Sequence, residues 1–136
     1  MPIQVELVSP ERILYSGEAD MVIARTSEGD IAFLTGHAPF IGALGIGPVT
    51  IESTGGGRVQ AAVHGGFVEV SNNKVTILSD VAELAEQIDV ARAEDALRRA
   101  GAAPADDAER ADALRRAELR LSIARGGAAA GARAAH

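Results

Sequence analysis

The 136-residue sequence contains no cysteine and no tryptophan, and aromatic residues make up only 3% of it. Without cysteine there is no disulfide framework, no thiolate nucleophile and no thiolate metal ligand. With so few aromatic rings, a hydrophobic core has to be built from aliphatic side chains and alanine. Lys74 is the only lysine, and no G-x-x-x-x-G-K-[ST] sequence occurs, which excludes a phosphate-binding loop of that type.

Basic residues are also scarce, with 13 against 19 acidic ones and a formal net charge of -6. Binding to nucleic acid backbones needs a cationic face, so we expect no nucleic-acid partner. The first residues, Met-Pro-Ile-Gln-Val-Glu, lack the basic segment and apolar run of a signal peptide, which predicts residence in the cytosol. Residues 31–51 carry no charged side chain, but their four glycines and two prolines favour short buried strands and turns over a membrane span.

Catalytic patterns are missing as well. His64-Gly65-Gly66-Phe67 is similar to the oxyanion loop of esterases, but no G-x-S-x-G nucleophile sequence accompanies it, so a glycine-rich strand entry is the favoured interpretation. The histidines (His37, His64 and His136) are too scattered for a recognisable metal site. We therefore expect no catalytic residue and no bound metal.

The composition changes near residue 81. Seven of the 27 alanines precede this point and 20 follow it, whereas 11 of the 15 glycines precede it. A change this sharp is typical of two structural units. We expect them at residues 1–82 and 83–125, followed by a disordered tail at 126–136, whose glycine and alanine residues form no periodic apolar face.

The first unit has the pattern of β-strands. Ile3, Val5 and Leu7 alternate with polar residues, and similar short apolar segments recur every eight to twelve residues. Turn sequences separate them, among them residues 27–30 and Asn72-Asn73, since asparagine tolerates positive φ. The pattern predicts a sandwich or barrel of short strands.

The second unit has the pattern of two helices. Asp89 is a candidate N-cap for the first, which Gly101 and Pro104 should end. The second is expected to begin at Asp106 or Asp107. Large aliphatic side chains are few in this part, so we expect a helical hairpin that is only marginally held to its neighbour.

Arginines of the helices suggest a possible ligand. Arg92, Arg99 and an arginine of the second helix could converge on a phosphate, while Glu83 or Asp89 accepts from an adenine amine or a ribose hydroxyl. The alternative is that all these side chains form an exposed helix surface with charge pairs four residues apart.

Four segments, in order, resemble the epsilon subunit family of bacterial F-type ATP synthases, called delta in mitochondria. They are Ser16-Gly17, TSEGDIAFLTGHAPF at 26–40, HGGFVEVSNNKVTILSD at 64–80 and AELAEQIDVARAEDAL at 82–97. The resemblance implies an α+β fold, with an N-terminal flattened β-sandwich of short antiparallel strands and a C-terminal α-helical hairpin.

The same resemblance implies a function and partners. Members are non-catalytic subunits of the central stalk that bind the gamma subunit and the ring of c subunits, and so couple proton flow to ATP synthesis. It further implies a peripheral position on the cytoplasmic face of the bacterial inner membrane, without lipid insertion. The C-terminal helices are candidates for contact with the alpha/beta catalytic head and for regulation of ATP hydrolysis.

The resemblance also assigns candidate site residues. The turn that faces the c-ring corresponds to Ser27, Glu28, Gly29 and Asp30. The gamma-facing segment corresponds to His37, Ala38, Pro39, Phe40 and Ile41. Residues 88–93 fit the I/L-D-x-x-R-A motif, so the candidate contacts of ATP as a regulatory ligand are Glu83, Ile88, Asp89, Arg92, Ala93 and Arg99. No required cofactor is implied. The alternative function is a free-standing nucleotide-binding regulatory module.

Overall fold

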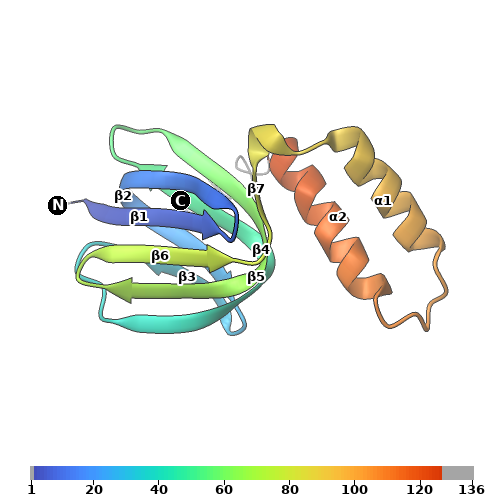
Figure 1. Ribbon diagram of the computed structural model, residues 1–136, viewed down its shortest axis with the longest axis horizontal. Helices are drawn as coiled ribbons and strands as arrows, with labels where there is room; N and C mark the ends of the chain where they lie inside the picture. Colours follow the sequence, from blue (N-terminus) through green and yellow to red (C-terminus); the bar gives the residue numbers. More distant parts are fainter. Residues whose placement is uncertain (1, 127–136) are drawn as a thin grey trace.

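A computed structural model describes residues 2–126 and places a layered β-structure before a pair of helices (Figure 1). The expected α+β class and helical hairpin are confirmed. The expected tail at 126–136 lies, apart from Gly126, outside the described residues. The strands are β1 (Ile3–Ser9), β2 (Arg12–Thr26), β3 (Gly29–Phe33), β4 (Phe40–Ser53), β5 (Arg58–Ser71), β6 (Lys74–Ser79) and β7 (Ala82–Leu84). A 3-10 turn, η1 (Ala85–Gln87), leads to the helices α1 (Val90–Ala102) and α2 (Arg110–Ala124).

The sheet closes on itself into a flattened sandwich. Its strand order is β1-β6-β5-β4-β2-β3, and β1 also pairs with β2, the neighbour of the edge strand β3, which closes β1, β6, β5, β4 and β2 into a ring. All pairings are antiparallel except that of β1 with β6, which is parallel. β7 adds to the first half of β5, so strand pairing extends to Leu84, beyond the expected boundary at residue 82.

The core between the layers is aliphatic, as the composition predicts. Phe33 is the one aromatic side chain among its fully buried members, and the others are mostly valine and isoleucine. Every buried member of this cluster lies between Ile3 and Ile77. The sandwich therefore encloses its own core without help from the hairpin.

Several strands are longer than the sequence pattern predicts, because glycines expected to end strands lie inside them. β2 has 15 residues, and β4 and β5 have 14 each. In β5 the inward-facing residues include Val63 before Gly65-Gly66 and Val68 after them. These two valines are an odd number of residues apart, so the alternation changes phase between them. β4 changes phase at the matching position. Both strands therefore continue through a glycine that, in the sequence, has the pattern of one strand ending and another beginning.

Gly66 is the residue that makes this break possible. Its φ is +129°, and a Cβ built on it would lie 2.1 Å from the carbonyl oxygen of Leu78 on β6. No other residue fits this conformation and this close approach. Residues 64–67 are therefore not the entry to a strand, as the sequence suggested, but a break in the middle of β5, because the glycines let the strand continue through the change of phase. The predicted Asn72-Asn73 turn is confirmed, with φ of 52° and 59°.

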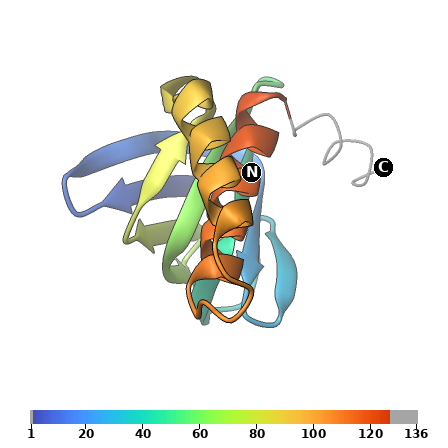
Figure 2. The same cartoon turned by 90° about the vertical axis from the view of Figure 1, so that its right-hand side faces the viewer.

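The two helices lie side by side, with α2 next to the strands and α1 outside it (Figures 1 and 2). Asp89 caps α1 as expected, since its Oδ1 accepts the backbone N–H of Arg92 at 3.1 Å. Gly101 lies inside α1 rather than after it, and α2 begins at Arg110 instead of Asp106 or Asp107, because residues 103–109 form turns. Neither described helix meets the length and hydropathy of a membrane-crossing segment.

The apolar contact between the hairpin and the sandwich is small. Ala62 of β5 packs with Ile88 and with Ile123 of α2. Alanine contributes little buried area, so this contact is weak beside the sandwich core. This small cluster agrees with the expectation that few aliphatic side chains hold the hairpin to its neighbour.

We expect Gly66→Ala to destabilise the sandwich strongly. The strained φ and the forced shift of the Leu78 carbonyl each cost about 1–3 kcal/mol. The control is Gly57→Ala, because a Cβ there meets only Ser53 Cβ at an ordinary 3.8 Å. Urea unfolding of both variants measures the difference, and equal free energies of unfolding would contradict the role assigned to Gly66.

Candidate functional site

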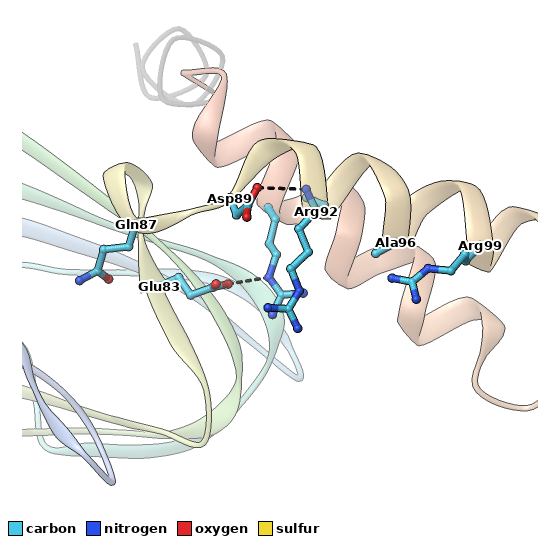
Figure 3. Close-up of a pocket in the computed structure, with 8 residues that line it drawn as sticks. Glu83, Gln87, Asp89, Arg92, Ala96 and Arg99 are labelled. Carbon is cyan, nitrogen blue, oxygen red and sulfur yellow. Dashed lines mark hydrogen bonds and ion pairs between the residues drawn. The ribbon is translucent and has the colours of Figure 1, made fainter.

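A pocket lies where β7 and η1 meet the hairpin (Figure 3). Its volume is about 410 Å³. Its lining combines charged side chains with two alanines, whose small size leaves the space open: Glu83, Gln87, Asp89, Arg92, Ala93, Ala96, Arg99 and Arg120. Three guanidinium groups against two carboxylates give the lining a net positive charge, which suits an anionic ligand.

One ion pair spans the pocket from the sandwich to the hairpin. Arg120 of α2 donates through Nε to Oε1 of Glu83 on β7 at 2.5 Å (Figure 3). Both side chains are 28% exposed, so the pair is screened less than a surface pair. Its two members come from residues 37 apart in the sequence. The contact therefore holds the hairpin in one register on the sandwich.

The other two arginines differ in their partners. Arg99 is paired on its own helix, with its Nε 3.2 Å from Oδ2 of Asp95. The guanidinium of Arg92 has no acidic partner among residues 2–126, while its backbone N–H is bound by Asp89. Arg92 is thus a cation whose side-chain donors are available to a ligand.

Most of the predicted nucleotide contacts come together here. Glu83, Asp89, Arg92, Ala93 and Arg99 all line the pocket. Ile88 does not line it. Its side chain is buried against Ala62 and Ile123, where it joins the hairpin to the sandwich.

Gln87 and Ala96 were not among the residues expected from the sequence, whereas the expected second-helix arginine at the site is Arg120. Ala96 follows Arg92 and Ala93 by helical spacing, and this signal could have identified it. Arg120 could not be chosen among the second-helix arginines, because the register of α2 on the sandwich depends on tertiary contacts.

His64 lies directly under the ion pair. Its Nε2 is 3.6 Å from Oε1 of Glu83, and its side chain is only 5% exposed. Burial and the nearby Arg120 lower the pKa of His64 to about 4, so the ring is neutral near pH 7. No group of three or more His, Asp or Glu side chains in residues 2–126 is arranged to hold a metal ion.

The segment expected to face the c-ring forms an exposed hairpin between β2 and β3. Ser27 and Glu28 make the turn, and Gly29 and Asp30 begin β3. Thr26 stabilises the turn, since its Oγ1 accepts the Glu28 N–H at 3.1 Å and donates to the Gly29 carbonyl at 2.8 Å. Asp30 binds the guanidinium of Arg25 at 2.9 and 3.4 Å, and this hydrogen-bonded carboxylate raises the pKa of Arg25. Only Glu28 therefore presents an unpaired carboxylate here.

The segment expected to face gamma divides into inward and outward side chains. The rings of His37 and Phe40 pack on the buried Phe33, with centroids 5.0 and 5.6 Å from it. Ala38 and Pro39 are exposed, and Ile41 is 72% exposed. Ile41 begins a larger apolar surface on the outer face of the sheet.

We call this surface the outer apolar row. Val8 is in register with Ile13 and Leu78, Leu78 with Phe67, and Phe67 with Ala43, so these side chains share one face across five strands. Ile13, Phe67 and Leu78 are 61%, 59% and 53% exposed. Ile41 lies two residues along β4 from Ala43. A contiguous apolar surface of this kind is typical of a protein-binding face.

Comparisons with known proteins agree with this geometry. The family model for the "ATP synthase, Delta/Epsilon chain, beta-sandwich domain" matches residues 2–85. The chain is similar to a protein of Streptomyces griseus named ATP synthase epsilon chain, at 50% identity over 88% of this chain and 92% of that one. A protein of the same name from Thermobifida fusca is 48% identical over 89% of this chain and 90% of its own.

Solved structures give the same result. A chain in the cryo-EM structure of the Euglena gracilis mitochondrial ATP synthase (OSCP/F1/c-ring) matches with a TM-score of 0.71 and 27% identity, covering 95% of this chain and 81% of that chain. A chain in the Tetrahymena thermophila mitochondrial ATP synthase, central stalk and c-ring, matches with a TM-score of 0.58 over 91% and 94% of the two chains. Its 16% identity supports the fold alone.

We expect Glu83 and Arg120 to be energetically coupled. In a double-mutant cycle with Glu83→Gln and Arg120→Gln, a partly buried, charge-assisted hydrogen bond should give a coupling of about 1–2 kcal/mol in urea unfolding. The matched pair is Asp95 and Arg98 on α1, which are 54% and 71% exposed and should couple by less than about 0.5 kcal/mol. Similar coupling energies in both pairs would show that the Glu83–Arg120 pair stabilises the protein no more than an exposed ion pair does.

Proposed function

Because the chain belongs to the ATP synthase delta/epsilon family, we propose that it is a non-catalytic subunit of the central stalk of a proton-translocating F-type ATP synthase. The observation that carries the proposal is the outer apolar row. A sandwich that already encloses its own core has no folding reason to leave six neighbouring apolar side chains in water. The row suits the centre of an obligate interface, where apolar and aromatic side chains predominate.

In this proposal the outer apolar row, with His37, Ala38, Pro39, Phe40 and Ile41 at its edge, binds the gamma subunit. The turn of Ser27, Glu28, Gly29 and Asp30 contacts the c-ring, and Glu28 supplies a carboxylate for basic or amide groups there. The subunit then lies at the cytoplasmic face of the bacterial plasma membrane as a peripheral member of the complex. It couples rotation of the ring to the catalytic head.

A second role is proposed for the pocket, which would take ATP as a regulatory ligand. The availability of the Arg92 guanidinium favours this role, because a cation without an acidic partner gains most from a phosphate. ATP held between Arg92, Arg99 and Arg120 would keep the hairpin docked and so keep its helices from the alpha/beta head. Release of the hairpin would then restrain ATP hydrolysis.

The alternative of a free-standing nucleotide-binding module relies on the same pocket but leaves the outer apolar row without a partner. Relatives named ATP synthase epsilon chain that match most of this chain favour the subunit. Copurification of the chain as a lone monomer, without large ATPase subunits, would favour the module.

We expect Phe67→Glu and Ile41→Glu each to weaken binding to purified gamma by at least about thirtyfold, as the loss of an interface anchor does. The matched control is Val81→Glu, which changes another exposed apolar residue, 47% exposed, away from the row. All three should keep the thermal midpoint nearly unchanged. Gel filtration with titrated gamma measures the affinity, and unaltered binding by both row variants would refute the assigned face.

The turn is tested in the same assembly. Glu28→Ala with Asp30→Ala should leave binding to gamma intact and weaken attachment to vesicles that contain the c-ring. A lowered thermal midpoint with normal attachment would instead assign the turn a structural role.

We expect the full chain to bind ATP, and Arg92→Gln to weaken this binding by about ten- to a hundredfold through loss of a charged hydrogen bond. Arg98→Gln on the same helix is the matched control, because Arg98 is 71% exposed and lies outside the pocket. Isothermal titration calorimetry measures both. If the unsubstituted chain does not bind ATP, ATP is not its ligand. A separate test is to remove the residues from Asp89 onward and to measure ATP hydrolysis by the complex. An unchanged rate would contradict the regulatory role.

A further inference from the structure

His64 is an ionisable side chain enclosed between the sandwich and the hairpin. It lies on β5 just before the phase break, and its main-chain N–H donates to the Val81 carbonyl at 2.9 Å. Both ring nitrogens are buried, and neither has a hydrogen-bond partner among the described residues. A buried polar group without a partner costs stability, so its retention at a joint between two units needs an explanation.

The charges around the ring come from β7 and α2. Glu83 of β7 places Oε1 3.6 Å from His64 Nε2, but the same oxygen already accepts the hydrogen bond of Arg120. Arg116 and Arg120 of α2 add two positive charges that act on the ring. On β4 the residue in register is the apolar Ile46. A protonated ring would therefore meet one shared carboxylate and two guanidinium groups.

We infer that His64 is a proton-sensitive contact between the two units, whose protonation releases the hairpin from the sandwich. The neutral ring is tolerated under α2, whereas the imidazolium is repelled by Arg116 and Arg120 and is shielded from solvent by burial. Release of the hairpin returns the ring to solvent and separates it from these arginines. The contact acts without nucleotide or partner subunit, and so extends beyond the proposed function.

The direction of the effect follows from the pKa in the two states. Burial first, and Arg120 second, lower the pKa of His64 from 6.5 to about 4 when the hairpin is docked. The docked state therefore binds fewer protons. The free energy by which the neutral ring favours the docked hairpin is fully present above about pH 6.5 and is lost as the pH falls from there toward about 4. Between about pH 7.5 and 5.5 the ratio of docked to released hairpin should fall about tenfold.

Hydrogen–deuterium exchange of the full chain, corrected for intrinsic exchange rates, tests this inference. Protection of residues 90–124 should fall about tenfold from pH 7.5 to 5.5, while protection of residues 3–9 in β1 stays constant. His64→Gln, which keeps a polar side chain of similar size but cannot take the proton, should remove the pH dependence. His37→Gln is the matched control and should behave as the unsubstituted chain, because His37 packs on Phe33 and Phe40 away from the hairpin.

Hairpin protection that is independent of pH in the unsubstituted chain, or that falls equally in His64→Gln, would overturn the inference. If His64→Gln does not fold, an NMR titration of the unsubstituted chain decides the question. The pKa of the His64 ring should then lie well below 6.5, and a value near 6.5 would overturn the inference.

Discussion

The close approach of Gly66 to the Leu78 carbonyl is the constraint on which two surfaces depend, the face that contacts the hairpin and the outer apolar row. It allows β5 to change phase without ending, so the alternation of inward and outward side chains differs before and after the break. His64 and Ala62, before the break, lie under the hairpin. Phe67, immediately after it, is at the centre of the outer apolar row. A single strand thus carries the contact with the hairpin and the surface assigned to gamma, fixed in relative position by one glycine.

The hairpin is attached by different physical means from those that hold the sandwich together. The sandwich has a core of fully buried aliphatic side chains, whereas the hairpin has a few small apolar contacts and the Glu83–Arg120 pair. Charge-assisted contacts respond to ligands, salt and protons, while a sealed aliphatic core does not. The pocket, the ion pair and His64 all lie at this joint. Its stability is therefore adjustable while that of the sandwich is not.

The sequence predicts the main division and much of the site, for reasons that particular residues make clear. Alternation at Ile3, Val5 and Leu7 and the capping role of Asp89 depend on local geometry, and both are recovered. The lengths of β4 and β5 are not predicted correctly, because a change of phase at glycine gives the same sequence pattern as the end of a strand. Arg120 and His64 depend on how α2 is seated against the sandwich, which no local pattern encodes. The motif at residues 88–93 locates the pocket, yet Ile88 within it faces the apolar joint.

The matched phase change in β4 and β5 also restricts how the length of this chain can vary. Loss of one residue at Gly65-Gly66 alone would place Val63 and Val68 an even number of residues apart, so β5 could alternate without a break, while β4 kept its phase change with no matching residue opposite it. A compensating loss in β4 near Gly45 would restore the match. Deletions and insertions in these two strands should therefore be tolerated only as pairs, whereas the exposed turn at Gly55-Gly56-Gly57 between them can change length freely.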